Sequence, residues 1–267
     1  MANRTLDHHP RRFELTNELH ARPFMPVTSP ARAVMIAFKK TENAAERDPD
    51  RDRAHLVELI DRHGGAHPAP AANHHLADFG RFSMKWERHT EFVTYLLVQQ
   101  LVPGEEPFTG GLAAQFPPEW LDSAPGKVIA AVEIEVLAAP DEAAAEKMLS
   151  GPLGRAFNPE SLVMARVIDG KARAVGDFRI HEAGYSRFAL ILHGEVGPRR
   201  VGRAVQRLLE IETYRVLSML ALPIAREVTG RLNEIDRELA GLIQRVAERE
   251  TVAGSEKTIL DQLTALS

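Results

Sequence analysis

The sequence ARAVMIAFK at residues 31–39 is an apolar run of strand length, and a helical pattern follows it. Because almost every residue in the run is apolar, we expect a buried strand. Residues 50–63 have helical spacing, with Leu56, Leu59 and Ile60 on one face, and a Gly-Gly pair comes directly after them, as at many helix ends. This part of the chain is therefore predicted to form a strand and then a helix.

The same order of elements occurs twice. Residues 81–87 and 91–99 alternate apolar and polar side chains, which predicts a β-hairpin. After a loop-like link at residues 103–123, the segment KVIAAVEIEVLA at residues 127–138 predicts a strand and residues 140–149 predict a helix. Three more strands are expected at residues 161–168, 172–180 and 186–192.

This restart suggests an internal duplication. A shift of 96 positions places Phe82 on Phe178, so two β-α-β-β units are possible, with halves at about residues 31–100 and 127–193. Alternating strands match one another at any even offset, so chance is the alternative. We predict the α+β class, with a mixed or antiparallel sheet built from these units.

The chain becomes helical after residue 197. Residues 199–222 predict a buried helix that Pro223 should kink or interrupt. Beyond it, apolar residues recur at alternating spacings of four and three, as in the seam of a coiled coil or helical hairpin. The seam residues are Leu232, Ile235, Leu239, Leu242 and Val246. We expect an α+β domain at residues 1–196, then a helical stalk at residues 197–267 that makes a homo-oligomer.

Composition limits the functional classes. With 267 residues, 44% of them hydrophobic and 26% charged, the chain is long enough to bury a substantial core. Its formal charge of -4 gives no electrostatic footprint for nucleic acid, and it has no cysteine for a disulfide, a thiolate zinc site or a cysteine nucleophile. No run approaches the roughly 18 apolar residues that a membrane helix needs.

Several long strings resemble one family. They are FELTNELHARPF at residues 13–24, KWERHTEF at 85–92, PPEWLDSAPG at 117–126, GDFRIHEAGYSRF at 176–188, GRAVQRLLEIETYR at 202–215 and LALPIAR at 220–226. Together they resemble a bacterial family of uncharacterised membrane-anchored proteins, which is a domain of unknown function. The resemblance names no activity.

The resemblance implies a longer protein with an apolar membrane segment toward its C-terminus. We therefore expect this chain to end before the anchor and to lie at the cytoplasmic face of the bacterial inner membrane, with the membrane as a partner through segments that follow it. An α/β domain, long helices and C-terminal membrane segments also occur in that order in CorA-type divalent-cation transporters. That similarity is one of layout only.

One candidate catalytic cluster lies at the end of the predicted strand at residues 81–87 and in the turn after it. Lys85, Glu87, His89 and Glu91 would project from one face of an extended segment, where His89 and a glutamate could form an acid/base pair. A solvated face with cross-strand ion pairs is the alternative interpretation.

A candidate ligand-binding face lies on the helix at residues 202–215. Arg203, Arg207, Glu210 and Tyr214 are spaced by four, three and four residues, which places them on one helix face. The arginines could bind a phosphate or carboxylate, with Glu210 orienting them. An ion-pair ladder that docks the helix on the sheet would use the same residues.

The remaining polar clusters are less specific. Glu18, His20 and Arg22 form a third cluster near the N-terminus, and the histidine pairs at residues 8–9 and 74–75 lack metal-ligand spacing. Residues 65–75 are expected to be an exposed loop. The sequence identifies no cofactor and no metal site. The leading hypothesis is a domain with a sensing, assembly or transport-coupling role; a hydrolase built on His89 and a protein-binding scaffold are the alternatives.

Overall fold

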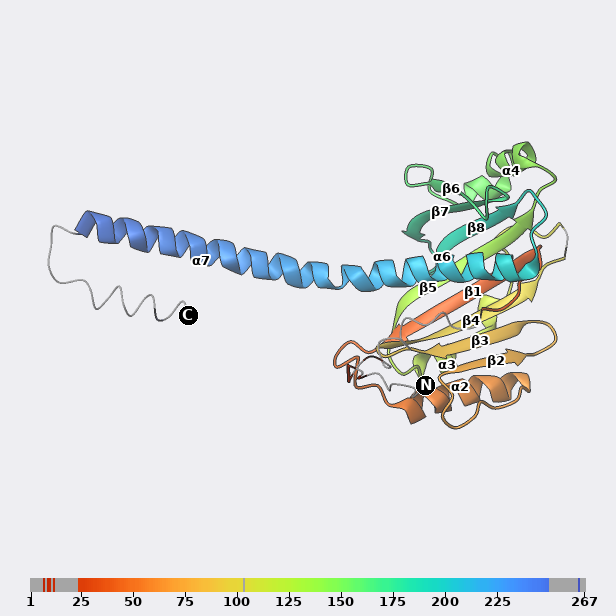
Figure 1. The fold of residues 1–267 in the computed structure, drawn as a ribbon, viewed down its shortest axis with the longest axis horizontal. Helices are drawn as coiled ribbons and strands as arrows, with labels where there is room; N and C mark the ends of the chain where they lie inside the picture. The colour runs from red at the N-terminus through yellow and green to blue at the C-terminus, as the bar shows by residue number, and fades with distance from the viewer. Residues whose placement is uncertain are drawn as a thin grey trace, which may run out of the picture. The chain divides into compact units, whose positions relative to one another are not determined.

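The computed structural model describes residues 7, 9, 10, 12, 24–102, 104–249 and 264. The chain forms two compact units, Met1–Tyr214 and Arg215–Ser267 (Figure 1). The first unit contains an eight-stranded sheet, and the second contains the long helix α7 (Ala221–Arg249).

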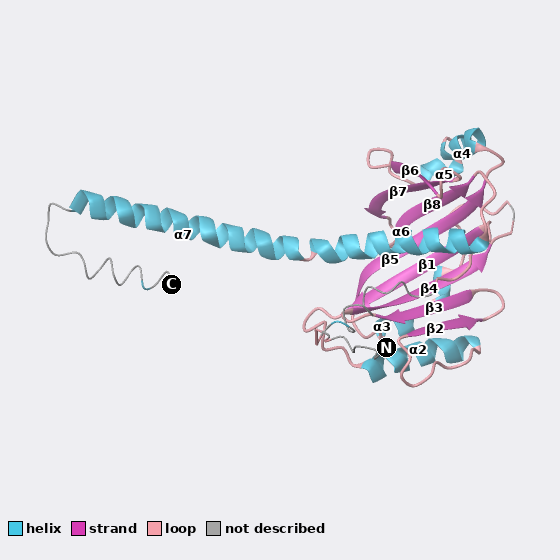
Figure 2. Ribbon diagram, in the orientation of Figure 1, coloured by secondary structure: helices cyan, strands magenta, loops and turns pink. Residues whose placement is uncertain are grey.

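The sheet of the first unit is mixed (Figure 2). Its order is β2-β3-β4-β1-β5-β8-β7-β6. The strands are β1 (Ala31–Lys39), β2 (His74–Asp78), β3 (Ser83–Arg88), β4 (Phe92–Gln100), β5 (Lys127–Ala138), β6 (Val163–Val167), β7 (Ala172–Ile180) and β8 (Ser186–Leu192). Neighbouring strands are antiparallel except β5 and β8, which run parallel. The predicted α+β class with a mixed sheet is confirmed.

Helices cover both faces of this sheet. They are α2 (Pro49–His63), α3 (Pro118–Asp122), α4 (Glu142–Leu149), α5 (Pro152–Arg155) and α6 (Pro198–Met219), with a short 3-10 turn at Ala113–Gln115. Trp86 on β3 packs in the core with α2, whereas its neighbour Lys85 reaches Gln206 on α6. Successive side chains of a strand point to opposite faces, so α2 and α6 lie on opposite faces of the sheet.

The central strand explains the predicted apolar run. β1 pairs with β4 on one side and β5 on the other, and it is buried on both faces. Ile36 and Tyr95, which are paired in register, join Trp86 and Leu59 in the core under α2. Burying a large apolar side chain contributes roughly 1.5–3 kcal/mol, so this cluster is the main source of stability for that face.

The two halves of the sheet agree with a duplication in one respect only. Outward from the central β1–β5 pair, one half runs β1, β4, β3, β2 and the other runs β5, β8, β7, β6, which is the same order within each half. However, β1 and β4 are antiparallel, whereas β5 and β8, which the 96-residue shift aligns with them, are parallel. The halves thus differ in strand direction, and the duplication stays a hypothesis.

One local prediction needs correction, and another is confirmed. His74–Asp78, placed partly in an exposed loop, is the edge strand β2, which is held by its pairing with β3. The predicted interruption of the helix by Pro223 is present, because α6 ends at Met219, four residues before the proline, and α7 begins at Ala221. Pro223 therefore lies in the first turn of α7, where the backbone N–H that it lacks would have no partner within the helix.

The first seventeen residues of α6 belong to the sheet-containing unit, which ends at Tyr214. Val201, Val205 and Leu209 are buried along this part of the helix. The expected stalk boundary at residue 197 therefore differs from the unit boundary, because the amphipathic pattern of α6 serves to pack it on the sheet.

Candidate functional site

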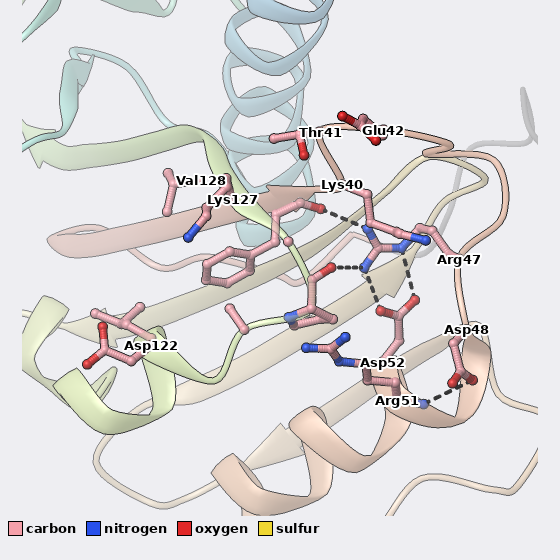
Figure 3. Close-up of a pocket in the computed structure, with 15 residues that line it drawn as sticks. Lys40, Thr41, Glu42, Arg47, Asp48, Arg51, Asp52, Asp122, Lys127 and Val128 are labelled. Carbon is pink, nitrogen blue, oxygen red and sulfur yellow. Dashed lines mark hydrogen bonds and ion pairs between the residues drawn. The ribbon is translucent and has the colours of Figure 1, made fainter.

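A pocket of about 560 Å³ lies where β1 ends and α2 begins (Figure 3). Its walls come from the end of β1 with the loop after it, the first turn of α2, and the link from α3 into β5. The volume falls within the roughly 300–1,000 Å³ of small-molecule sites. Eight of its fifteen lining residues are charged, so its ligand must be polar: Lys40, Glu42, Arg47, Asp48, Arg51, Asp52, Asp122 and Lys127.

Arg47 joins the three walls of the pocket. Its guanidinium binds both carboxylate oxygens of Asp52, through Nε at 3.0 Å and through Nη2, and both side chains are almost completely buried. It also donates to the carbonyl oxygens of Phe38 and Pro125. Such a two-pronged pair is geometrically specific. Arg47 and Asp52 therefore neutralise each other and hold the pocket open in one shape.

The N-terminus of α2 is already capped. The Asp48 carboxylate accepts hydrogen bonds from the backbone N–H groups of Asp50 and Arg51, at 2.9 and 3.3 Å. Pro49, the first residue of the helix, has no N–H to offer. A ligand in this pocket would therefore be bound by side chains rather than by the open end of the helix.

Three cationic side chains remain available at the pocket. Lys40, Arg51 and Lys127 form no ion pair within the part of the chain that the structure describes, although Lys40 donates to the Glu46 carbonyl oxygen at 3.1 Å. Figure 3 shows Arg51 and Lys127 entering from different walls. This arrangement can bind an oxyanion from several sides.

A buried aromatic cluster backs the pocket. His55 stacks on Trp120 with ring centroids 4.0 Å apart, and Phe38 meets Trp120 edge-on. His55 Nε2 lies 2.9 Å from the Trp120 carbonyl oxygen, so this nitrogen carries the proton, and Nδ1 accepts from the Tyr95 hydroxyl at 2.8 Å. Burial lowers the pKa of His55. The neutral ring therefore fixes α2 against α3.

Comparison with protein families places residues 7–267 within one family model, described as a protein of unknown function (DUF3422). The chain belongs to the DUF3422 family. No curated protein and no solved structure matches it. The predicted resemblance to a domain of unknown function is confirmed at this level.

Two further properties of this DUF3422 chain concern membranes and metals. None of the helices in the described part of the chain combines the length and apolar character that crossing a bilayer requires. Residues with assigned positions also include no group of three or more His, Asp or Glu side chains that could hold a metal ion.

The candidate catalytic cluster is divided between strand and turn. β3 ends at Arg88, so Lys85 and Glu87 lie on the strand, whereas His89 and Glu91 lie in the turn before β4. Lys85 Nζ lies 3.0 Å from Glu87, and Glu91 pairs with Lys39 at 2.5 Å. His89 stacks on Phe92 at 4.1 Å. Both glutamates thus have lysine partners.

The candidate ligand-binding residues of α6 share one face, as their spacing predicts. Arg203, Arg207, Glu210 and Tyr214 all have exposed side chains. Tyr214 meets Phe92 edge-on at 6.1 Å. None of these four residues, and none of the β3 cluster, lines the pocket at α2.

Gln206 connects the two predicted clusters. It accepts from Lys85 Nζ at 3.1 Å and donates to Glu210 at 2.7 Å. The resulting chain of contacts, from Glu87 through Lys85 and Gln206 to Glu210, docks α6 on β3. Sequence reasoning missed Gln206 because it lies one residue outside the predicted stripe.

The pocket at α2 was also missed. Its only local signal is the acidic start of α2, and that pattern is typical of any capped helix. The approach of Lys127 depends on the β1–β5 pairing, which no local pattern specifies. The third predicted cluster, Glu18, His20 and Arg22, lies outside the described residues.

Proposed function

We propose that this DUF3422 chain is a sensing domain that binds a small oxyanionic ligand, bearing a phosphate or carboxylate group, in the pocket at α2. The observation that carries the proposal is that Lys40, Arg51 and Lys127, which come from three segments, all line one cavity. Arginine and lysine side chains in this arrangement are the usual ligands of phosphate and carboxylate groups.

The arrangement of the charges around the pocket, rather than their sum, supports an anion. The lining has four basic and four acidic residues, and Arg47 and Asp52 neutralise each other. Three cations then face three carboxylates, but the Asp48 carboxylate already accepts two backbone N–H groups of α2. The remaining acids, Glu42 and Asp122, would select against ligands that carry negative charge over their whole surface.

A ligand in this pocket would hold three segments of the chain together. It would contact the loop after β1, the first turn of α2 and the start of β5 together, and so favour the arrangement in which these segments close on one another. Such a response is what a sensing or transport-coupling domain of a membrane-anchored protein needs. The resemblance noted above supports placing it at the cytoplasmic face of the bacterial inner membrane.

The ion pairs favour this role over a hydrolase centred on His89. General acid/base catalysis by Glu87 or Glu91 would first require separation from Lys85 or Lys39. A scaffold role for the C-terminal helices is compatible with sensing.

The test is thermal unfolding and calorimetric titration with inorganic phosphate, citrate and a nucleoside monophosphate, each matched in ionic strength by sodium chloride. A ligand that binds only the folded chain raises its stability, by about 2.7 kcal/mol at 100 times Kd. We expect at least one oxyanion to give a saturable rise in Tm.

Variants locate the effect. Arg51→Gln and Lys127→Gln should each weaken binding at least tenfold. Arg62→Gln is the matched control, because Arg62 lies in the last turn of the same helix, in an exposed pair with Glu58. Equal weakening in all three variants, or no rise above sodium chloride with any oxyanion, would contradict the proposal.

A further inference from the structure

A second cavity lies on the opposite face of the sheet from the pocket at α2. Its volume is about 320 Å³, and it is bounded by α6 on one side and by β7, β8 and the turn after β6 on the other. Leu190, Leu208 and Ile211 contribute to an apolar floor, and Arg200, Arg203 and Arg207 contribute charge. All of these residues belong to the sheet-containing unit.

Two of the three arginines are not neutralised. Arg200 pairs with Asp169 at the cavity edge. Arg203 and Arg207 form no ion pair with any residue whose position is described; Arg203 instead lies over the Phe24 ring, with Cζ 5.0 Å from its centroid. Glu210, one helical turn from Arg207, accepts from Gln206. Two positive charges therefore stand beside an apolar cavity without a counterion among the residues that the structure describes.

The first turn of α6 adds positive charge at the cavity. It contains Arg199 and Arg200 and no acidic residue. Cations are destabilising at this end of a helix because the macrodipole is positive there. A bound anion would compensate this charge.

The floor of the cavity excludes a simple inorganic ion as the best-fitting ligand. Ile211 is 54% exposed although it lines the cavity, so apolar surface remains uncovered beside the arginines. An alkyl chain would remove that surface from water. At the low end of the roughly 300–1,000 Å³ of small-molecule sites, the cavity has room for a short chain but not for a whole phospholipid.

We infer that this cavity binds a single-chain amphipathic anion, such as a medium-chain carboxylate, with its head group on Arg203 and Arg207 and its alkyl chain on Leu190, Leu208 and Ile211. This inference is independent of the pocket at α2, because the two cavities lie on opposite faces of the sheet and share no residue.

The test is calorimetric titration of the whole chain with decanoate below its micelle concentration. Acetate supplies the head group alone and decanol supplies the chain alone. We expect one decanoate per chain, bound at least tenfold more tightly than either. If acetate bound as tightly as decanoate, the apolar floor would contribute nothing to binding. If decanol bound as tightly as decanoate, the arginines would contribute nothing. Either result overturns the inference.

Variants and vesicles complete the test. The double variant Arg203→Gln/Arg207→Gln should lose at least tenfold in decanoate affinity. Arg199→Gln is the matched control on the same helix, because Arg199 does not line this cavity, and Arg51→Gln should also bind normally. An equal loss of decanoate affinity in Arg199→Gln would overturn the inference. Binding to anionic phospholipid vesicles without binding of free decanoate would also overturn it, and would indicate a membrane-binding surface instead.

Discussion

The guanidinium of Arg32 donates to the carboxylate of Glu135 across the β1–β5 pair at 2.6 Å, and both side chains are buried, with 4% and 0% of their surface exposed. Arg32 also donates to the Thr109 carbonyl oxygen, and Glu135 accepts from the backbone N–H of Phe108. The pair therefore anchors the loop before α3 to the centre of the sheet.

Removing one partner of this pair should be strongly destabilising. Arg32→Met leaves the Glu135 charge buried and unpaired, which costs about 3–5 kcal/mol in comparable cases. We expect a loss of this size in the free energy of unfolding, measured with urea. Arg32→Met/Glu135→Met should lose less than the sum of the two single variants, and strict additivity would mean that the two charges do not depend on each other.

His55 should make the stability of the chain depend on pH. Because burial lowers its pKa in the folded state below the ordinary value of 6.5, the unfolded chain takes up the proton first. The contribution of His55 is therefore fully present above pH 6.5 and is lost as pH falls through the lower, folded-state pKa.

The measurement is urea unfolding at about pH 7.5 and about pH 5.5, on either side of the ordinary histidine pKa. His55→Gln should be less stable than the natural chain at the higher pH but should lose less on acidification. His67→Gln is the control, because His67 is half exposed. An unchanged pH dependence in His55→Gln would show that another group is responsible.

Gly202 should be required for the packing of α6. A Cβ atom at this position would lie 1.9 Å from the Met25 backbone oxygen, so any larger residue forces the backbone to move. We expect Gly202→Ala to lower the free energy of unfolding by about 1–3 kcal/mol, as overpacking does elsewhere. At Gly197, a Cβ atom would meet nothing within 4 Å, so Gly197→Ala is the matched control. Similar losses in both variants would rule out the close contact as the cause.

The sequence predicted those elements whose signals are local. The strands at residues 31–39 and 127–138 have the predicted bounds, because each is a predominantly apolar segment with a clear end. Strand direction left no such signal: side-chain alternation is the same in parallel and antiparallel neighbours, so the parallel β5–β8 pair could not be foreseen.

The same limit applies to the sites. Helical spacing placed Arg203 and Arg207 on one face, but the cavity beside them needs Leu190 from β8, which only the tertiary fold brings there. The pocket at α2 needs Arg47 to reach Pro125 across the β1–β5 pair. Local pattern thus located single side chains, and the sheet order determined which of them meet.

The helix of the second unit has an exposed apolar face. Along α7, the predicted seam residues Leu232, Ile235 and Leu239 are 54%, 37% and 37% exposed, and Val228, one turn earlier, is 49% exposed. Their spacings of four, three and four are those of the a and d positions of a coiled coil. Leu242, also predicted in the seam, is buried. The side chain of Val246, the last predicted seam residue, lies outside the described residues.

The charges beside the seam favour a second copy of this chain as the partner. Arg231 comes directly before the a position and therefore occupies a g position. Asp236 comes directly after the d position and therefore occupies an e position. In a parallel two-stranded coiled coil, a g residue of one helix faces the e residue five positions later on the other helix. Arg231 of one copy would then face Asp236 of the other. We propose a parallel homodimer; a helical hairpin within one chain is the alternative.

Sedimentation of the chain at micromolar concentration distinguishes them. The natural chain should be dimeric, and Leu232→Glu/Leu239→Glu should be monomeric, because four carboxylates would be placed in the dimer seam. Asn233→Glu, which adds the same charge beside the seam rather than within it, should remain dimeric. Asp236→Arg should weaken the dimer and Arg231→Asp/Asp236→Arg should restore it, since like charges at g and e repel and the exchange makes them opposite again. A monomeric natural chain, or a Leu232→Glu/Leu239→Glu variant that stays dimeric, would show that this face packs elsewhere.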